Sequence, residues 1–431
     1  MAETLQTLKG AWKAPELRKK ILFTLLILLI YRLGNAIPVP YVDVELLATY
    51  FEENLNNTVL GLYNAMSGSA FSRATVFALS ITPYINSSII MQLLCIAIPY
   101  LERLSKEGGE EGKKKIASIT RYVTVGLALI LGFAYYTMLK NYGMLTQTGF
   151  LTGLVIVLTF TAGSAFIMWL GEQITEFGIG NGISIILFAS IISRIPTTVS
   201  NAITNIIGGA QSIFGVLLIL VLAVVLVAVI VFVSQAERRI PIQYAKQMRG
   251  RKMYGGQSTH LPIKVNMSGV MPVIFAQSIA SLPATILAFN DPSNDSGFTT
   301  FIRNITDTTG VVYAIVYFLL IIGFGYFYAA IQYNPIEIAN NLKKNGGFIP
   351  GFRAGRPTSE FIQKVINKIV LFGSLYLGVV AILPIIISNI SGYASLAIGG
   401  TSIIIVVGVA LETVRALEAQ MMMRNYKGFL E

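Results

Sequence analysis

Residues 213–232 read IFGVLLILVLAVVLVAVIVF and contain no charged, amide or hydroxyl side chain. A helix of about 20 residues is about 30 Å long, which matches the thickness of the hydrocarbon core of a bilayer. A helix also satisfies its own backbone hydrogen bonds, so it is stable where no water is present. This stretch therefore predicts a membrane-spanning helix.

Apolar runs of similar length recur on both sides of this one. Of the 431 residues, 54% are hydrophobic and only 12% are charged, and the mean hydropathy is +0.68. The runs lie at residues 21–37, 75–98, 119–139, 151–170, 183–195, 213–232, 270–287, 311–331, 370–387 and 393–414. We therefore expect an all-α polytopic membrane protein with ten transmembrane helices. The first run lacks a small-residue cleavage site, so we expect it to stay as an anchor.

The positive charges predict the orientation of these helices. An even number of spans places both termini on one side, and all but five of the 32 Lys and Arg residues lie in the termini and the alternate connections on that side. The exceptions are Arg32, Arg73, Lys140, Arg194 and Arg303. Cytoplasmic loops carry such an excess of Lys and Arg, so both termini are expected in the cytoplasm. The net charge of +11 needs no nucleic acid to explain it.

The ten runs divide into two sets of five. Two halves with an odd number of spans have opposite orientations, as in an inverted repeat. In the N-terminal segment, Leu5, Leu8 and Trp12 lie at helical spacing, which predicts an amphipathic helix on the inner membrane surface. The expected divisions are a cytoplasmic segment 1–20, an N-terminal half 21–212, a C-terminal half 213–414 and a cytoplasmic tail 415–431.

Two spans, the second and the seventh, contain prolines and amide or hydroxyl side chains. These are Asn86, Ser87, Ser88, Gln92, Gln277 and Ser278. Such groups are costly in contact with lipid tails, so they should face protein or water. Spacing alone supports ordinary packing between helices equally well.

Several functions are disfavoured by what the sequence lacks. No charged residue lies near the middle of a run, which weakens a secondary transporter of small solutes without removing it as the alternative. No phosphate-binding G-x-x-x-x-G-K-[ST] motif is present, so a motor must be another protein. Cys95 and His260 are the only residues of their kinds, so they cannot form a disulfide or a metal site by themselves. We expect no catalysis and no cofactor.

Two connections on the basic side are longer than a link between helices requires. Residues 235–265 and 334–368 combine basic clusters with Gly, Pro and aromatic residues. Exposed Arg and Tyr side chains favour docking of a partner that is acidic or carries nucleic acid. We therefore predict that both loops bind a partner.

Four segments resemble the signature segments of the bacterial SecY family (SecY/Sec61-alpha), the channel subunits of the Sec protein translocase. They are NAMSGSAFSRATVFALSITPYINSSIIMQLL (64–94), GIGNGISIILFASII (178–192), YAKQMRGRKMYGGQSTHLPIKVNMSGVMPVIFAQSI (244–279) and GFIPGFRAGRPT (347–358). The resemblance implies two inverted five-helix halves around a central hourglass pore. It also implies a lateral gate between the second and third spans on one side and the seventh and eighth on the other.

Site residues follow from the resemblance position by position. It implies a pore ring of Ile81, Ile85, Ile183, Leu187, Ile274 and Ile405. It implies a plug half-helix within 60–74, whose residues Asn64, Ala65, Met66, Ser67, Gly68, Ser69, Ala70, Phe71, Ser72 and Arg73 are mostly small enough for close but weak packing. The lateral gate would include Asn86, Ser87, Gln92, Gln277 and Ser278. Docking of SecA or the ribosome would use Arg249, Arg251, Lys252, Arg353 and Arg356.

The function implied is a protein-conducting channel in the bacterial plasma membrane. Secretory polypeptides would pass through it, and apolar segments would leave sideways into membrane lipids. The implied partners are SecE and SecG as permanent subunits, the SecA ATPase or a ribosome as the source of driving force, and signal peptides and nascent or unfolded polypeptides as cargo.

Overall fold

A computed structural model gives the fold of the chain. It describes residues 12, 14–55, 58–209, 212–244, 247–249, 252–254, 258–288, 297–308, 310–391 and 400–427. The α-helices are α2 Pro15–Gly34, α3 Val44–Tyr50, α4 Val59–Met66, α5 Thr82–Ala97, α6 Pro99–Lys106, α7 Gly109–Asn141, α8 Phe150–Phe177, α9 Gly182–Ile192, α10 Ile195–Ile207, α11 Ile213–Gln235, α12 Met271–Ala288, α13 Gly297–Thr306, α14 Val311–Gln332, α15 Pro335–Lys344, α16 Arg356–Ser391 and α17 Gly400–Lys427. The strands are β1 Glu237–Tyr244, β2 Gln247–Arg249, β3 Lys252–Tyr254, β4 Ser258–Lys264 and β5 Gly347–Phe348.

Long apolar helices dominate the fold, as the sequence predicts. Within the described residues, the stretches long and apolar enough to cross a membrane are Gly109–Asn141, Phe150–Phe177, Gly182–Ile207, Ile213–Gln235, Val311–Lys344, Arg356–Ile387 and Gly400–Met422. The pair α5 and α6, bent by 101°, would add an eighth. The first and seventh predicted runs coincide with α2 and α12. The fold is therefore that of a polytopic helical membrane protein, and the count of ten spans stays a prediction.

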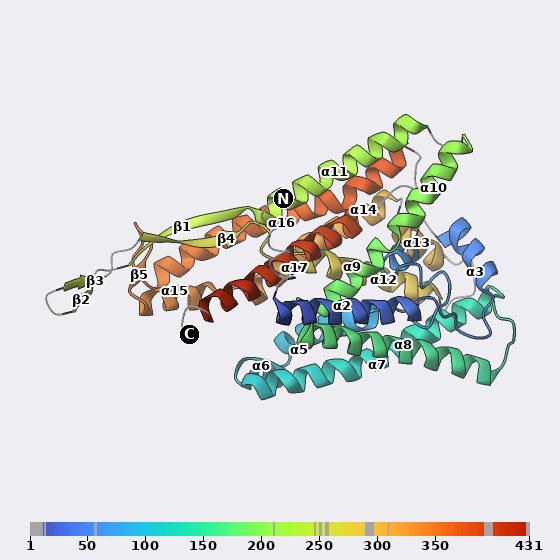
Figure 1. Cartoon of the computed structure of the whole chain (residues 1–431), viewed down its shortest axis with the longest axis horizontal. Coiled ribbons are helices and arrows are strands. Elements are labelled where there is room, and N and C mark those ends of the chain that lie inside the picture. The colour runs from blue at the N-terminus through green and yellow to red at the C-terminus, as the bar shows by residue number, and fades with distance from the viewer. Residues whose placement is uncertain are drawn as a thin grey trace.

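Each half of the chain packs largely within itself. In the N-terminal half α7 packs against α5 and α8, and in the C-terminal half α14 packs against α12 and α16. The halves meet where α17 contacts α9 and where α12 contacts α4, α5 and α7. Figure 1 shows α6, α15, the strands and the end of α17 at one end of the molecule, and α3 and α13 towards the other. The charge-rich connections thus share one end, as the orientation argument expects.

A small sheet forms in the long loops, which the sequence analysis did not predict. β1 lies between β4 and β5 and is antiparallel to both. Ile240 and Ile242 are buried while their neighbours in β1 are exposed, which is the alternation of a strand with one face covered. They join Ile263 in a hydrophobic cluster with Leu342 of α15 and Ile362 of α16. The sheet is therefore anchored to the C-terminal half.

The second span begins later than predicted. The run was expected to start at residue 75, but residues 76–81 form turns and α5 starts at Thr82. Ala74 and Ser80 have positive φ angles of 43° and 50°, which a helix does not allow. Pro83 lies in the first turn of α5, where its missing N–H is not needed. Apolar composition alone did not distinguish these turns from helix.

Some predictions fall outside the described residues. Of the amphipathic N-terminal segment, residues 1–11 and 13 are not described, and Trp12 is exposed. Residues 393–399, at the start of the tenth predicted run, are also not described. For this run, the described helix α17 begins at Gly400.

A glycine in α8 allows the irregular segment before α5 to pack closely. A Cβ atom on Gly163 would overlap the carbonyl oxygen of Val76. The atom in the way belongs to the backbone of Val76, so a change of side-chain rotamer cannot relieve the overlap. Gly126 in α7 offers the opposite case, because a Cβ there would meet nothing within 4 Å.

We expect Gly163→Ala to lower the free energy of unfolding by about 1–3 kcal/mol, because overpacking forces the backbone to shift. Gly126→Ala should be neutral or slightly stabilising, since Ala favours the helix. Thermal unfolding of the two purified variants in detergent measures the difference. Equal transition temperatures would show that the segment before α5 is not held against α8.

Candidate functional site

The six residues assigned to the pore ring all belong to, or pack against, one hydrophobic cluster. Ile81 and Ile85 come from the start of α5, Ile183 and Leu187 from α9, Ile274 from α12 and Ile405 from α17. All but Ile183 are buried members of one hydrophobic cluster, and Ile183 packs against that cluster. Because α5 and α9 belong to one half and α12 and α17 to the other, this apolar cluster joins the two halves.

Local structure fixes the direction of α9 and its ring residues. Asn181 caps the helix, and its Oδ1 atom accepts hydrogen bonds from the N–H groups of Ile183 at 3.0 Å and Ser184 at 3.4 Å. Behind the ring, Gly171 of α8 lies so close that a Cβ would be 3.4 Å from Ile183 and 3.6 Å from Ile81. α8 therefore supports ring residues from both α5 and α9.

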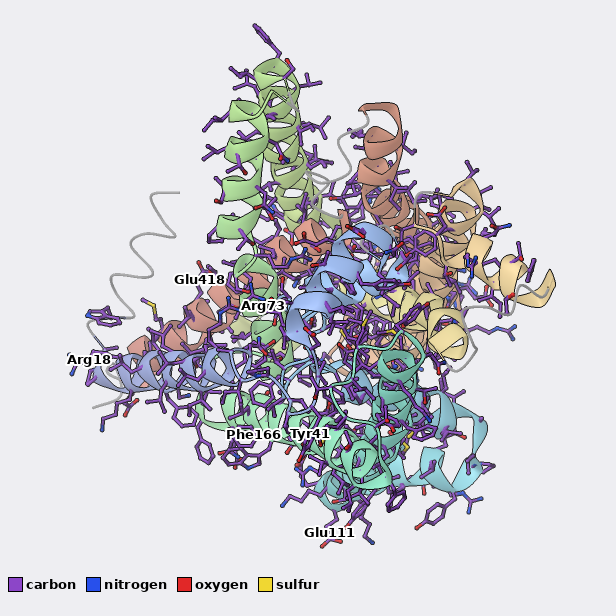
Figure 2. The ribbon with its side chains drawn as sticks, turned by 90° about the vertical axis from the view of Figure 1, so that its right-hand side faces the viewer. Arg18, Tyr41, Arg73, Glu111, Phe166 and Glu418 are labelled. Atoms are coloured by element: carbon purple, nitrogen blue, oxygen red, sulfur yellow. The ribbon has the colours of Figure 1, made fainter. Side chains whose placement is uncertain are left out.

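The segment assigned to the plug is a short helix followed by a compact turn. α4 covers Val59–Met66 and contacts α9 and α12, one from each half. Ser67 and Ala70 are fully or almost fully buried, and Gly68 and Ser69 have φ angles of 68°. In Figure 2, which faces the end of the molecule that carries α3, Arg73 lies near the middle of the view. The segment thus lies at the centre of this end, in contact with both halves.

A polar cluster holds the turn against α2 and α9. The Tyr31 hydroxyl lies 2.7 Å from Ser190 Oγ and donates a long bond of 3.5 Å to the Ser67 carbonyl. Asn35 Nδ2 donates to the same carbonyl at 3.4 Å. A Cβ on Gly68 would lie 3.0 Å from the Ser190 carbonyl oxygen, and its φ angle of 68° also favours glycine at this position. The small residues of this turn therefore allow it to pack closely against α2 and α9.

An aromatic anchor, which the sequence analysis missed, also holds the plug. Phe71 stacks on Tyr135 of α7 with ring centroids 4.3 Å apart and contacts Tyr63 edge-on at 5.1 Å. The Tyr135 hydroxyl donates a short hydrogen bond to the Phe71 carbonyl. The expectation of weak packing therefore needs correction, because Phe71, the aromatic residue of 64–73, is buried among aromatic neighbours.

The structure shows why these partners were missed. Tyr31, Tyr135 and Ser190 lie inside apolar runs, where single hydroxyl groups are common and carry no spacing signal. Each acquires its role from a segment far away in the chain: Tyr135 is 64 residues from Phe71, and Tyr31 is 159 residues from Ser190.

The gate residues are only partly brought together. α5 and α12 are in contact, and Gln277 and Ser278 are buried. Ser87 donates a 2.7 Å hydrogen bond to the Thr120 carbonyl of α7, inside its own half. Among the described residues no hydrogen bond joins Asn86, Ser87 or Gln92 to the α12 pair, and Gln277 Oε1 is buried without a partner. The Ser87 hydroxyl is thus bonded within its own half in this structure, and the assignment of these residues to a lateral gate stays a prediction.

The basic residues assigned to docking, as far as the structure describes them, lie at the end that carries the sheet. Arg353 is exposed, and its carbonyl accepts a 2.8 Å hydrogen bond from the Thr358 hydroxyl. Arg356 forms a 3.0 Å ion pair with Glu360, and both side chains are exposed. Of Arg249 and Lys252 only the backbone is described, in β2 and β3, and Arg251 lies outside the described residues.

Comparisons with known proteins agree over nearly the whole chain. The family model SecY matches residues 75–414. The protein translocase subunit SecY of Streptomyces scabiei is 46% identical over 434 residues, covering 97% of this chain and 98% of its own length. That of Bacillus subtilis (strain 168) is 44% identical over 436 residues and 99% of each chain. A solved structure described as that of a protein conducting channel has a TM-score of 0.66 at 17% identity, covering 93% of this chain and 92% of its own.

We expect Phe71→Ala to loosen the plug, because truncating a buried aromatic ring removes about 3–5 kcal/mol of packing. Hydrogen exchange of the amides at 67–75 should become markedly faster. Phe150→Ala, which truncates a highly exposed ring on α8, is the matched control and should leave this exchange unchanged. Equal protection in both variants would show that the aromatic contact does not hold the segment.

Proposed function

The chain belongs to the SecY family, and from this premise we propose that it is the channel-forming subunit of a protein translocase. Relatives of nearly the same length are named as such subunits, and the fold is similar to that of a protein conducting channel. One observation from the structure of this chain supports the proposal. Apolar residues from both halves meet in a buried cluster, and a short plug helix contacts both halves beside it.

In this proposal the apolar cluster is the closed constriction of the pore. A narrow ring of Ile and Leu side chains excludes water and therefore resists ions. The same side chains are flexible enough to seal around a polypeptide once the halves separate. The plug packs through Gly68 and Phe71, and its displacement would open the route.

Apolar segments of the cargo would leave sideways between the halves. The contacts of α12 with α5 and α7 support a seam at this position. Leu, Ile, Phe and Val each favour the bilayer by about 0.3–0.6 kcal/mol, while a central Asp, Lys or Arg costs about 2.5–3.5 kcal/mol. Partitioning through the seam would therefore retain apolar helices in the membrane and let polar segments pass.

The driving force would come from partners that bind the basic loops. Arg353 is exposed, and together with Arg356 and the tip near Arg249, Arg251 and Lys252 it would bind SecA or a ribosome. SecE and SecG would complete a heterotrimer. The excess of Lys and Arg in these loops supports cytoplasmic termini in a bacterial plasma membrane.

Reconstitution tests the proposal directly. The chain is placed in vesicles with SecE and SecG, and SecA, ATP and a secretory precursor are added outside. ATP-dependent protection of the precursor from protease is the expected result. Uptake of a small solute driven by an ion gradient, with no protection of the precursor, would favour the secondary transporter instead.

We expect Arg353→Glu to reduce SecA-driven protection about tenfold or more, because a reversed charge in a docking loop opposes binding. The protein should still fold, since the side chain is exposed. Lys140→Glu is the control and should retain activity. It also reverses an exposed charge, but at the C-terminal end of α7 and outside the basic loops. Unchanged export and SecA affinity in Arg353→Glu would remove this residue from the docking site.

We expect Ile405→Asn to raise the ion leak of channel-containing vesicles and to admit precursors with weak signal sequences, because an amide wets the constriction. Val380→Asn is the control: Val380 lies in the same buried cluster, on α16, which carries no ring residue. Ion flux and precursor protection are measured for both. If the two variants leaked equally, Ile405 would be ordinary core.

A further inference from the structure

β1 and β4 form a two-stranded ribbon at the end of the molecule that carries α15. Figure 1 shows the ribbon running alongside α15 and α16, with β2 and β3 beyond it. The register pairs Glu237 with Lys264 and continues to Gln243 with Ser258. β5 pairs only with Gln243 and Tyr244, at the end of β1. Most of both outer edges of the ribbon is therefore not covered by a strand within the described residues.

The hydrogen bonds of the ribbon determine which residues face these edges. Val265 N–H donates to the Ala236 carbonyl at 2.9 Å, which makes 236 and 265 a hydrogen-bonded pair. Such pairs alternate along an antiparallel ladder, so the pairs at 238, 240 and 242 of β1 are also hydrogen-bonded. At the intervening residues, the N–H and C=O groups point outwards, away from the partner strand.

Both prolines of the ribbon occupy these outward positions. Pro262 of β4 is opposite Arg239, and Pro241 of β1 is opposite His260. Each outer edge therefore has one residue near its middle with no N–H and with a ring in its place. The side chains of both prolines are exposed.

These prolines remove no hydrogen bond from the ribbon itself. An N–H at 241 or 262 would point away from the β1–β4 ladder, so the ladder needs no proline at either position. The missing donors affect only a chain that approaches from outside. An uncovered strand edge is a template for pairing with another extended chain, and edge prolines are a known protection against it.

We propose that Pro241 and Pro262 close the two edges of this ribbon to strand addition by unfolded polypeptides. The inference rests on the proposed function, in which extended chains pass near this end of the molecule. A sheet with open edges would capture such chains through their backbones, whatever their sequence. With the edges closed, a partner can use only the side chains of the ribbon, and the cargo stays free to move.

The test measures binding of an extended peptide to the full chain in nanodiscs. The probe is a short fluorescent peptide rich in Thr and Val, and its copy with alternate backbone nitrogens methylated cannot pair as a strand. We expect Pro262→Val to bind the unmodified peptide about three- to tenfold more tightly than the parent, as one added hydrogen bond allows. The methylated copy should show no gain.

Two further variants make the result specific to the edge. Adding His260→Pro to Pro262→Val moves the proline two residues along the same edge, so affinity should return to the parent level. Pro335→Ala changes a proline at the start of α15, which is not part of either ribbon edge, and should have no effect. Hydrogen exchange at Leu261 and Ile263, whose N–H groups point into the ladder, reports whether the ribbon is intact.

Unchanged peptide affinity in Pro262→Val, with the ladder still protected, would overturn the proposal. If that variant lost its ladder, Pro241→Val would repeat the test on the other edge, with the same expected gain. The export assay on the parent chain is read separately. Failure of export there would refute the translocase, whereas peptide capture alone decides the role of the prolines.

Discussion

Backbone groups at membrane depth must find partners within the protein, and this constraint explains the centre of the molecule. Helices meet it by themselves, but the segment between α4 and α5 is irregular. Its carbonyl groups are bound by side chains from elsewhere: Tyr63 donates to Leu79, Tyr135 to Phe71 and Ser164 to Ser80. These hydroxyl groups supply partners for carbonyl groups of a buried segment that is not helical.

The same constraint limits how the two halves are held together. Between helices in lipid, close packing and hydrogen bonds replace the hydrophobic effect as the source of association. The described contacts between the halves run through α12, α17 and the plug helix α4, and the ring residues are part of the apolar cluster that the halves share. A contact made of small and flexible apolar groups can open without leaving many polar groups unpaired, which suits the separation of the halves in the proposed function.

The helices were predictable from the sequence, because runs such as residues 213–232 have only one stable form in lipid. The ring positions came from a resemblance, since Leu187 and Ile405 look like any core residue in isolation. The late start of α5 was not predictable, because residues 76–81 are as apolar as the helix that follows. The sheet was missed because its alternation, with Ile240 and Ile242 inward, was hidden among basic residues. The bond from Ser87 to Thr120 depends on how α5 and α7 are rotated, which composition does not encode.

Among the described residues, non-glycine residues with positive φ are Tyr41, Ser69, Ala74 and Ser80, and the last three lie within or next to the plug. Such conformations cost about 1–3 kcal/mol each and persist only where the surroundings enforce them. Once the anchor at Phe71 is lost, the segment can relax into ordinary turns, and the free energy released offsets part of the cost of leaving. This strained backbone therefore lies within or a few residues after the segment that moves in the proposed function.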